Sequence, residues 1–132
     1  MTPVAAVGSL RVLIVEDEAL IRWAVAETLT EAGHTVLEAP DAATALRVVN
    51  TSDPIDVVLL DFRLPDSDDL SLVERIRRQT PSSAIVMMTA FGTPQMRADA
   101  KKLGVHEVVG KPFDVGAVAE LLAEACRSKA SE

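Results

Sequence analysis

Five polar residues follow uninterrupted apolar runs, and their side chains are of types that suit phosphoryl chemistry. Asp61 and the pair Glu16-Asp17 each come directly after such a run, and Thr89 and Lys111 follow two others later in the chain. In an open parallel α/β sheet the carboxyl ends of the strands meet at one edge, where ligands bind. We therefore expect Glu16, Asp17, Asp61, Thr89 and Lys111 to share one site.

This set of side chains favours phosphoryl transfer to a carboxylate. Three carboxylates held close together repel one another, and Mg²⁺, which prefers carboxylate, water and phosphate oxygens, removes that repulsion. A carboxylate beside the ion can attack a phosphoryl group and form an acyl phosphate. Lys111 offers a compact positive charge and Thr89 a hydroxyl donor for the phosphoryl oxygens. We expect Asp61 to be the nucleophile.

The elements that position these residues alternate regularly along the chain. Five apolar segments are predicted as strands, and a helical stripe of apolar residues follows each of them. Gly33 and Gly104 are typical of helix ends. Alternating strands and helices predict an α/β domain whose parallel sheet carries helices on both faces. The predicted strands are residues 12–15, 35–38, 57–60, 84–88 and 107–109.

The length and charge of the chain narrow its class. At 132 residues we expect one domain over residues 10–127, with a flexible leader at 1–9 and a short tail at 128–132. The net charge of −7 argues against direct nucleic-acid binding, which needs a basic face. No apolar run reaches the roughly 18 to 20 residues of a membrane span. The single cysteine, Cys126, is typical of a reducing cytoplasm.

These residues stand in an order that resembles one known family. The chain resembles the receiver domain of two-component response regulators, which carries an acidic pair, an acceptor aspartate, a threonine and a lysine at these positions. Leu64-Pro65, Ala90 and Pro112 complete its motifs, and Thr89 and Lys111 stand 22 positions apart as in the family. The segments 88–93 and 109–113 look most like receivers of nitrogen-regulator-type activators.

The resemblance implies a fold and a ligand set. The fold would be flavodoxin-like, a doubly wound five-stranded parallel sheet of order 2-1-3-4-5. Asp17, Asp61 and the backbone carbonyl of Arg63 would bind Mg²⁺ directly, and Glu16 would act through a metal-bound water. Thr89 and Lys111 would bind the phosphoryl oxygens. The Lys111-Pro112 peptide would be cis.

The resemblance also implies partners. Asp61 would receive its phosphoryl group from a histidine kinase or a phosphotransfer protein. Phosphorylation would shift the face formed by the fourth helix, the fifth strand and the fifth helix, which would act on an unidentified output and could form a homodimer. The chain would not be an enzyme beyond its own phosphotransfer and autodephosphorylation.

Two positions depart from the family pattern. Val108 stands three residues before Lys111, where receivers usually carry an aromatic switch residue. Asp69 stands eight residues after the acceptor, where the family usually has glycine; if φ there were positive, aspartate would tolerate it better than most residues.

Two loop residues are predicted to flank the route of water to the phosphoryl group. Arg63 and Phe91 each stand two positions after a site residue. Our hypothesis is that Phe91 restricts water and lengthens the phosphorylated lifetime. The alternative is that both are surface loop residues without a kinetic role.

Two other function classes remain open at this point. One is an enzyme of similar fold, although Arg63 stands where a phosphatase would have a second acid, and Glu16-Asp17-Glu18 replaces the phosphate cradle of a flavin protein. The other is a docking module that has lost phosphorylation, which predicts a missing acceptor or acidic pair, and neither is missing.

Several residues are expected to have only structural roles. Trp23 is predicted to pack on or near the first helix, and Cys126 to be inert. The histidines and the arginine cluster are predicted to be solvent-exposed: His34, His106, Arg75, Arg77 and Arg78.

Overall fold

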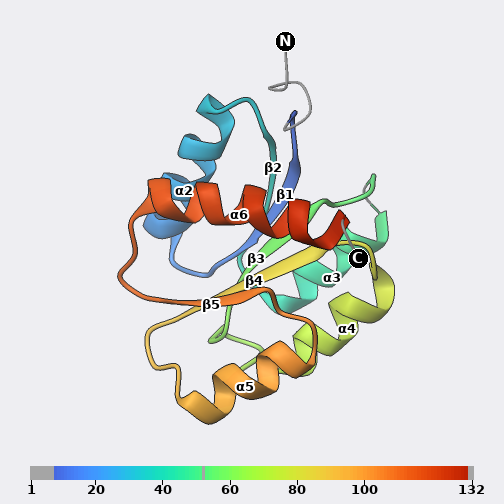
Figure 1. The fold of residues 1–132 in the computed structure, drawn as a ribbon, viewed down its shortest axis with the longest axis vertical. Helices are drawn as coiled ribbons and strands as arrows, with labels where there is room; N and C mark the ends of the chain where they lie inside the picture. The colour runs from blue at the N-terminus through green and yellow to red at the C-terminus, as the bar shows by residue number, and fades with distance from the viewer. Residues whose placement is uncertain (1–7, 52, 131–132) are drawn as a thin grey trace.

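The computed structural model describes residues 8–51 and 53–130. Five parallel strands form one sheet in the order β2-β1-β3-β4-β5, and five helices alternate with them in this part of the chain (Figure 1). The predicted α/β class and strand order are confirmed. The strands are β1 (Arg11–Val15), β2 (Thr35–Ala39), β3 (Val57–Asp61), β4 (Ala84–Thr89) and β5 (Glu107–Gly110), and the helices are α2 (Ala19–Glu31), α3 (Ala42–Thr51), α4 (Ser71–Gln79), α5 (Pro94–Lys102) and α6 (Val115–Ala130).

The structure describes only part of the predicted leader and tail of the domain. Residues 1–7 of the expected leader and residues 131–132 of the expected tail lie outside them. Residues 128–130 of the expected tail belong to α6. None of the described helices is long and apolar enough to cross a membrane.

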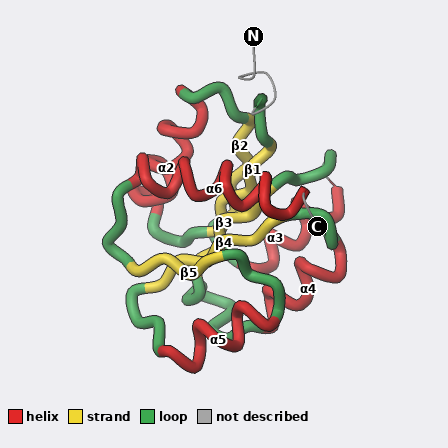
Figure 2. The backbone as a smooth tube through the Cα atoms, in the orientation of Figure 1, coloured by secondary structure: helices red, strands yellow, loops and turns green. Residues whose placement is uncertain are grey.

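The helices form two layers around the sheet. Figure 2 shows α2 and α6 on one face, and α3, α4 and α5 cover the other. Because successive side chains of a strand point to opposite faces, each buried strand supplies both layers. In β3, Val58 and Leu60 pack against α3 and α4, while Val57 and Leu59 pack against α2 and α6. This two-sided burial explains why the central strands are continuous apolar runs.

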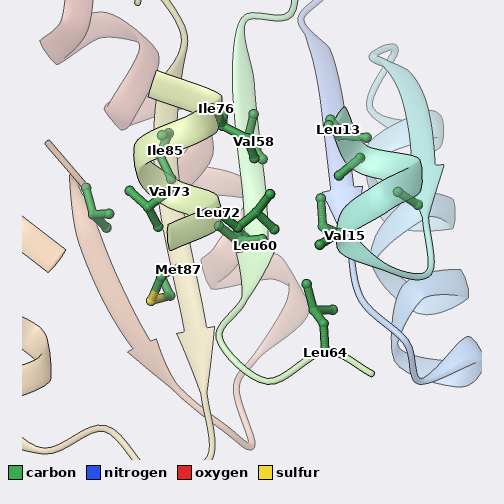
Figure 3. Packing of buried hydrophobic residues seen from close by; sticks show 14 of the residues in the cluster. Leu13, Val15, Val58, Leu60, Leu64, Leu72, Val73, Ile76, Ile85 and Met87 are labelled. Carbon is green, nitrogen blue, oxygen red and sulfur yellow. The ribbon is translucent and has the colours of Figure 1, made fainter. Parts of the chain in front are cut away.

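Helix α4 packs on the sheet through one apolar face. Figure 3 shows Leu72, Val73 and Ile76 of α4 lying over the side chains of β3 and β4. All three α4 residues are almost fully buried. Their spacing along one helical face therefore fixes α4 against the strand that ends at Asp61.

The helix ends follow the chemistry of their flanking residues. Gly33 and Gly104 both have φ of +95°, as the predicted helix stops require. The Thr93 hydroxyl accepts a hydrogen bond from the Met96 amide and caps α5. At α3, the Asp66 carboxylate accepts hydrogen bonds from the amides of Ala42 and Ala43, so the loop after β3 is tied to that helix.

Three expectations about residues outside the site are wrong. Arg77 is not part of a solvated face, because its guanidinium donates to the carbonyls of Pro81, Ser83 and Gly104. His34 is half-buried, and its Nδ1 accepts a hydrogen bond from the Leu10 amide. His106 is half-buried as well. Trp23 lies on α2, the first helix, as predicted, with 59% of its surface exposed.

Candidate functional site

The carboxyl ends of the central strands lie side by side. In the sheet register, Val15 pairs with Leu60, Asp61 with Met88, and Thr89 with Gly110. Because each chemically active residue ends its strand or follows it directly, this register gathers all five predicted residues at one edge.

Three acidic side chains form a cluster at this edge. Glu16, Asp17 and Asp61 each offer a carboxylate oxygen, and these oxygens all lie within 4.8 Å of one another. Glu16 and Asp61 are buried, whereas Asp17 is exposed. A cluster of carboxylate oxygens open on one side suits a hard divalent cation such as Mg²⁺.

Lys111 lies between two of the acids. Its Nζ is 2.7 Å from Glu16 Oε1 and 2.9 Å from Asp61 Oδ2. Burial alone would lower the pKa of Lys111, but the hydrogen bonds and negative charges of Glu16 and Asp61 outweigh it, so the pKa is raised. Lys111 is therefore held as a cation against the acceptor carboxylate.

The buried carboxylate of Glu16 is fully satisfied. Its second oxygen, Oε2, accepts a hydrogen bond from the Glu18 amide at 3.0 Å. The Glu16 carbonyl accepts from the guanidinium of Arg22, which also pairs with Glu38 at 3.1 Å. Arg22 thus fixes the backbone of the acidic pair, a role that the sequence did not indicate because its partner is a main-chain carbonyl.

Thr89 is buried beside the cluster. Its hydroxyl oxygen accepts a hydrogen bond from the Phe91 amide at 3.1 Å, which leaves the hydroxyl proton able to donate. Its carbonyl accepts from the Lys111 amide at 2.8 Å. The two residues predicted to bind phosphoryl oxygens are therefore joined through their backbones.

Arg63 and Phe91 lie beside each other next to the acceptor. The Arg63 amide donates to Asp61 Oδ1 at 3.3 Å, and its guanidinium carbon is 5.7 Å from the centre of the Phe91 ring. Both side chains are exposed, Phe91 to 73%. The predicted metal contact of the Arg63 carbonyl stays a prediction.

The structure shows the surroundings of the two residues that depart from the family pattern, Val108 and Asp69. Val108 is buried, and its carbonyl accepts a hydrogen bond from Arg97. Asp69 does not have a positive φ, since no described non-glycine residue does; its carboxylate accepts from the Ser71 amide at the start of α4. The Lys111-Pro112 peptide is cis, as the resemblance implied.

The chain is similar to known receiver domains. A family model for the response regulator receiver domain matches residues 12–123. The transcriptional regulatory protein PhoP of Escherichia coli is 38% identical over 106 residues, 80% of this chain and 47% of PhoP. The DNA-binding transcriptional regulator NtrC of Proteus hauseri is 32% identical over 114 residues, 86% of this chain and 24% of NtrC.

A solved structure shows the same fold. A CheY-like response regulator receiver domain protein from Methanospirillum hungatei matches with a TM-score of 0.87 at 22% identity, over 93% of this chain and 98% of that one. The NtrC match bears out the predicted likeness to nitrogen-regulator receivers. The chain spans less than half the length of PhoP and about a quarter of NtrC. On the family match and the fold together, the chain belongs to the receiver domains of two-component response regulators.

Proposed function

We propose that this receiver accepts a phosphoryl group on Asp61 from a phosphohistidine of a histidine kinase or phosphotransfer protein. The phosphorus–nitrogen bond breaks, a carboxylate oxygen of Asp61 forms the new phosphorus–oxygen bond, and the imidazole leaves and takes up a proton. The observation that supports this most is the placement of Lys111 Nζ within 2.9 Å of Asp61 Oδ2 inside an acidic cluster. That arrangement gives the acceptor a fixed cation and two neighbouring carboxylates that could hold a metal ion with it.

The acidic cluster fits Mg²⁺, and the site residues divide the remaining work. Asp17, Asp61 and the Arg63 carbonyl would hold the ion, with Glu16 acting through a bound water, and the ion would supply positive charge beside the acceptor. Lys111 and the Thr89 hydroxyl bind the phosphoryl oxygens once they are present. Water later attacks the phosphorus, which releases phosphate and restores the Asp61 carboxylate. Both reactions occur on the chain itself, so it is not an enzyme with a separate substrate.

The direct test is phosphorylation by a small donor. We expect the protein, incubated with acetyl phosphate and Mg²⁺, to gain one phosphoryl group in intact mass. The gain should disappear when EDTA is present and should be removed by hydroxylamine, which cleaves acyl phosphates. A protein that gains no phosphate, or gains one that resists hydroxylamine, would contradict the proposal.

A partner bearing the phosphohistidine would reach Asp61 across an apolar groove. Exposed Leu20 of α2, 75% accessible, borders this groove, and Lys111 lines it as well as the acidic cluster. A surface continuous with the acceptor is where the donor protein must lie during transfer. The groove is lined by Leu20, Ile21, Ala24, Lys111, Phe113 and Val115, with Pro112.

Leu20→Ser separates docking from chemistry. We expect transfer from a cognate phosphorylated kinase to slow by about tenfold, because an exposed apolar anchor of an interface is lost. Phosphorylation by acetyl phosphate should be unchanged, since the exposed aliphatic side chain of Leu20 supplies neither a metal ligand nor a donor to the phosphoryl oxygens. Equal slowing with both donors would show that the substitution disturbs the site rather than the docking surface.

Phe91→Glu tests the predicted control of phosphorylated lifetime. The variant removes the ring beside Arg63 and introduces a carboxylate that can orient water, so we expect dephosphorylation to accelerate by about tenfold or more. The loss of phosphoryl mass after donor removal measures the rate. Phe91→Tyr, which keeps the ring, should retain the wild-type lifetime. A Phe91→Glu protein with an unchanged lifetime would leave Phe91 without a kinetic role.

The face that would act on the output, formed by the fourth helix, the fifth strand and the fifth helix, stays a prediction. In the labels of Figure 1 it is formed by α5, β5 and α6, and it presents Glu107, Glu120 and Glu124 around a groove beside β5. A homodimer through this face would appear as a rise in mass by light scattering after phosphorylation. An unchanged mass at high concentration would contradict it.

A further inference from the structure

Arg97 links helix α5 to strand β5. It lies on α5, and its Nη1 donates a hydrogen bond of 2.7 Å to the carbonyl of Val108 in β5. The side chain is half-buried, so this bond is largely shielded from water. At this position, three residues before Lys111, the main-chain carbonyl of Val108 binds the Arg97 guanidinium.

The same guanidinium lies near the loop that follows Thr89. A Cβ built on Gly92 would lie 2.9 Å from Cγ2 of Thr89 and 3.3 Å from Nε of Arg97. The Thr89 methyl group and Arg97 Nε therefore both lie close to the space that a side chain at position 92 would occupy. Glycine at position 92 thus lets Arg97 and Thr89 approach the same side of this loop.

The Arg97 guanidinium also lies near the end of β5. A Cβ built on Gly110 would lie 3.8 Å from Nη2 of Arg97, and Gly110 directly precedes Lys111. The Lys111 amide in turn donates to the Thr89 carbonyl. Arg97 therefore lies near the loop after Thr89 and is hydrogen-bonded to β5, whose Lys111 is itself tied to Thr89.

We propose that Arg97 is a positioning residue for phosphoryl binding, which fixes the spacing between the Thr89 hydroxyl and the Lys111 ammonium. This inference rests on the proposed function, since it concerns the two groups that bind the phosphoryl oxygens. Arg97 touches neither Asp61 nor the acidic pair in any described contact, so it acts through Gly92 and Val108 alone. A planar guanidinium is suited to this, because it can donate to one partner while its faces pack against others.

Beryllofluoride, a phosphoryl mimic that binds carboxylates with Mg²⁺, tests the proposal. We expect Arg97→Met to weaken beryllofluoride binding by about tenfold, as the loss of a charge-assisted hydrogen bond predicts. Mg²⁺ binding to the unphosphorylated protein should change by less than about twofold, because the acidic cluster lies outside the contacts of Arg97. Arg97→Lys, which keeps one donor for the Val108 carbonyl, should recover part of the lost affinity.

Lys102→Met is the matched control. Lys102 is exposed on the same helix, so this variant removes a cation without touching Gly92 or Val108, and beryllofluoride binding should stay at the wild-type level. If Lys102→Met weakened binding as much as Arg97→Met, the effect would be one of net charge and the proposal would fail. Unchanged beryllofluoride binding in Arg97→Met, or equal weakening of Mg²⁺ binding, would also overturn it.

A second readout does not depend on phosphoryl chemistry. Amide hydrogen exchange at Lys111, which reports its bond to the Thr89 carbonyl, should accelerate in Arg97→Met by about tenfold and stay unchanged in Lys102→Met. A wild-type protein that binds no beryllofluoride would refute the proposed function, while the exchange rates would still decide whether Arg97 holds Thr89 and Lys111 together. Unaltered exchange in Arg97→Met would refute the positioning role itself.

Discussion

Asp61→Asn is expected to abolish phosphorylation completely. Asparagine keeps the shape of the side chain but replaces the nucleophilic carboxylate oxygen by an amide, which does not attack a phosphoryl group. It also removes the charge that Lys111 Nζ contacts at 2.9 Å, and one of the three acids within 4.8 Å. Intact mass after incubation with acetyl phosphate and Mg²⁺ should show no gain at donor concentrations that saturate the wild type.

The neighbouring acids supply the control for this result. Asp17→Asn should phosphorylate more slowly and need more Mg²⁺, because it removes a proposed metal ligand and leaves the acceptor intact. A phosphoryl group on Asp61→Asn would show that another carboxylate, with Glu16 and Asp17 the nearest candidates, is the nucleophile. In that event the assignment of Asp61 as the acceptor would be wrong.

Lys111→Met is expected to destabilise the metal-free protein by about 3 kcal/mol, the low end of the range for removing one partner of a buried ion pair. The wild-type lysine places one positive charge between two buried carboxylates, those of Glu16 and Asp61. Without it, both charges stay buried next to each other. Urea unfolding at neutral pH measures the loss, and Mg²⁺ should restore more stability to the variant than to the wild type, since the ion takes over the neutralisation.

The pH dependence of the wild type follows from the raised pKa of Lys111. A group whose pKa is higher in the folded state stabilises the protein fully below its ordinary value of 10.5, and that contribution is lost as the pH rises through the raised value. The wild type should therefore keep this contribution at neutral pH, where Lys111→Met lacks it. Lys102→Met is the control, and a comparable destabilisation by that exposed substitution would contradict the ion-pair explanation.

The sequence predicted the fold well because the relevant signals are local. Val12 to Val15 and Val57 to Leu60 are continuous apolar runs, and the structure buries them on both faces. Gly33 and Gly104 end helices through their positive φ, which glycine adopts readily because it has no Cβ. The meeting of the acidic pair with Asp61 followed from the rule that parallel strands end at one edge.

The sequence did not predict the contacts that hold the site in place. Arg77 stands among arginines that resemble a solvated helix face, yet it donates to three carbonyls. Asp66 caps α3 from 24 residues away, and Arg22 and Arg97 bind carbonyls near the acidic pair and in β5. Main-chain carbonyls and amides have nearly the same chemistry at every position, so the partners of these side chains carry no signal in the sequence.

The bond from Arg97 to a main-chain carbonyl has a consequence for comparative genetics. A carbonyl places no demand on the residue type that bears it, so homologues can vary at position 108 and keep the bond. Correlated substitutions identify contacts only when both side chains are constrained. Analyses of aligned homologues should therefore miss the tie between α5 and β5, even in lineages where losing Arg97 would impair signalling.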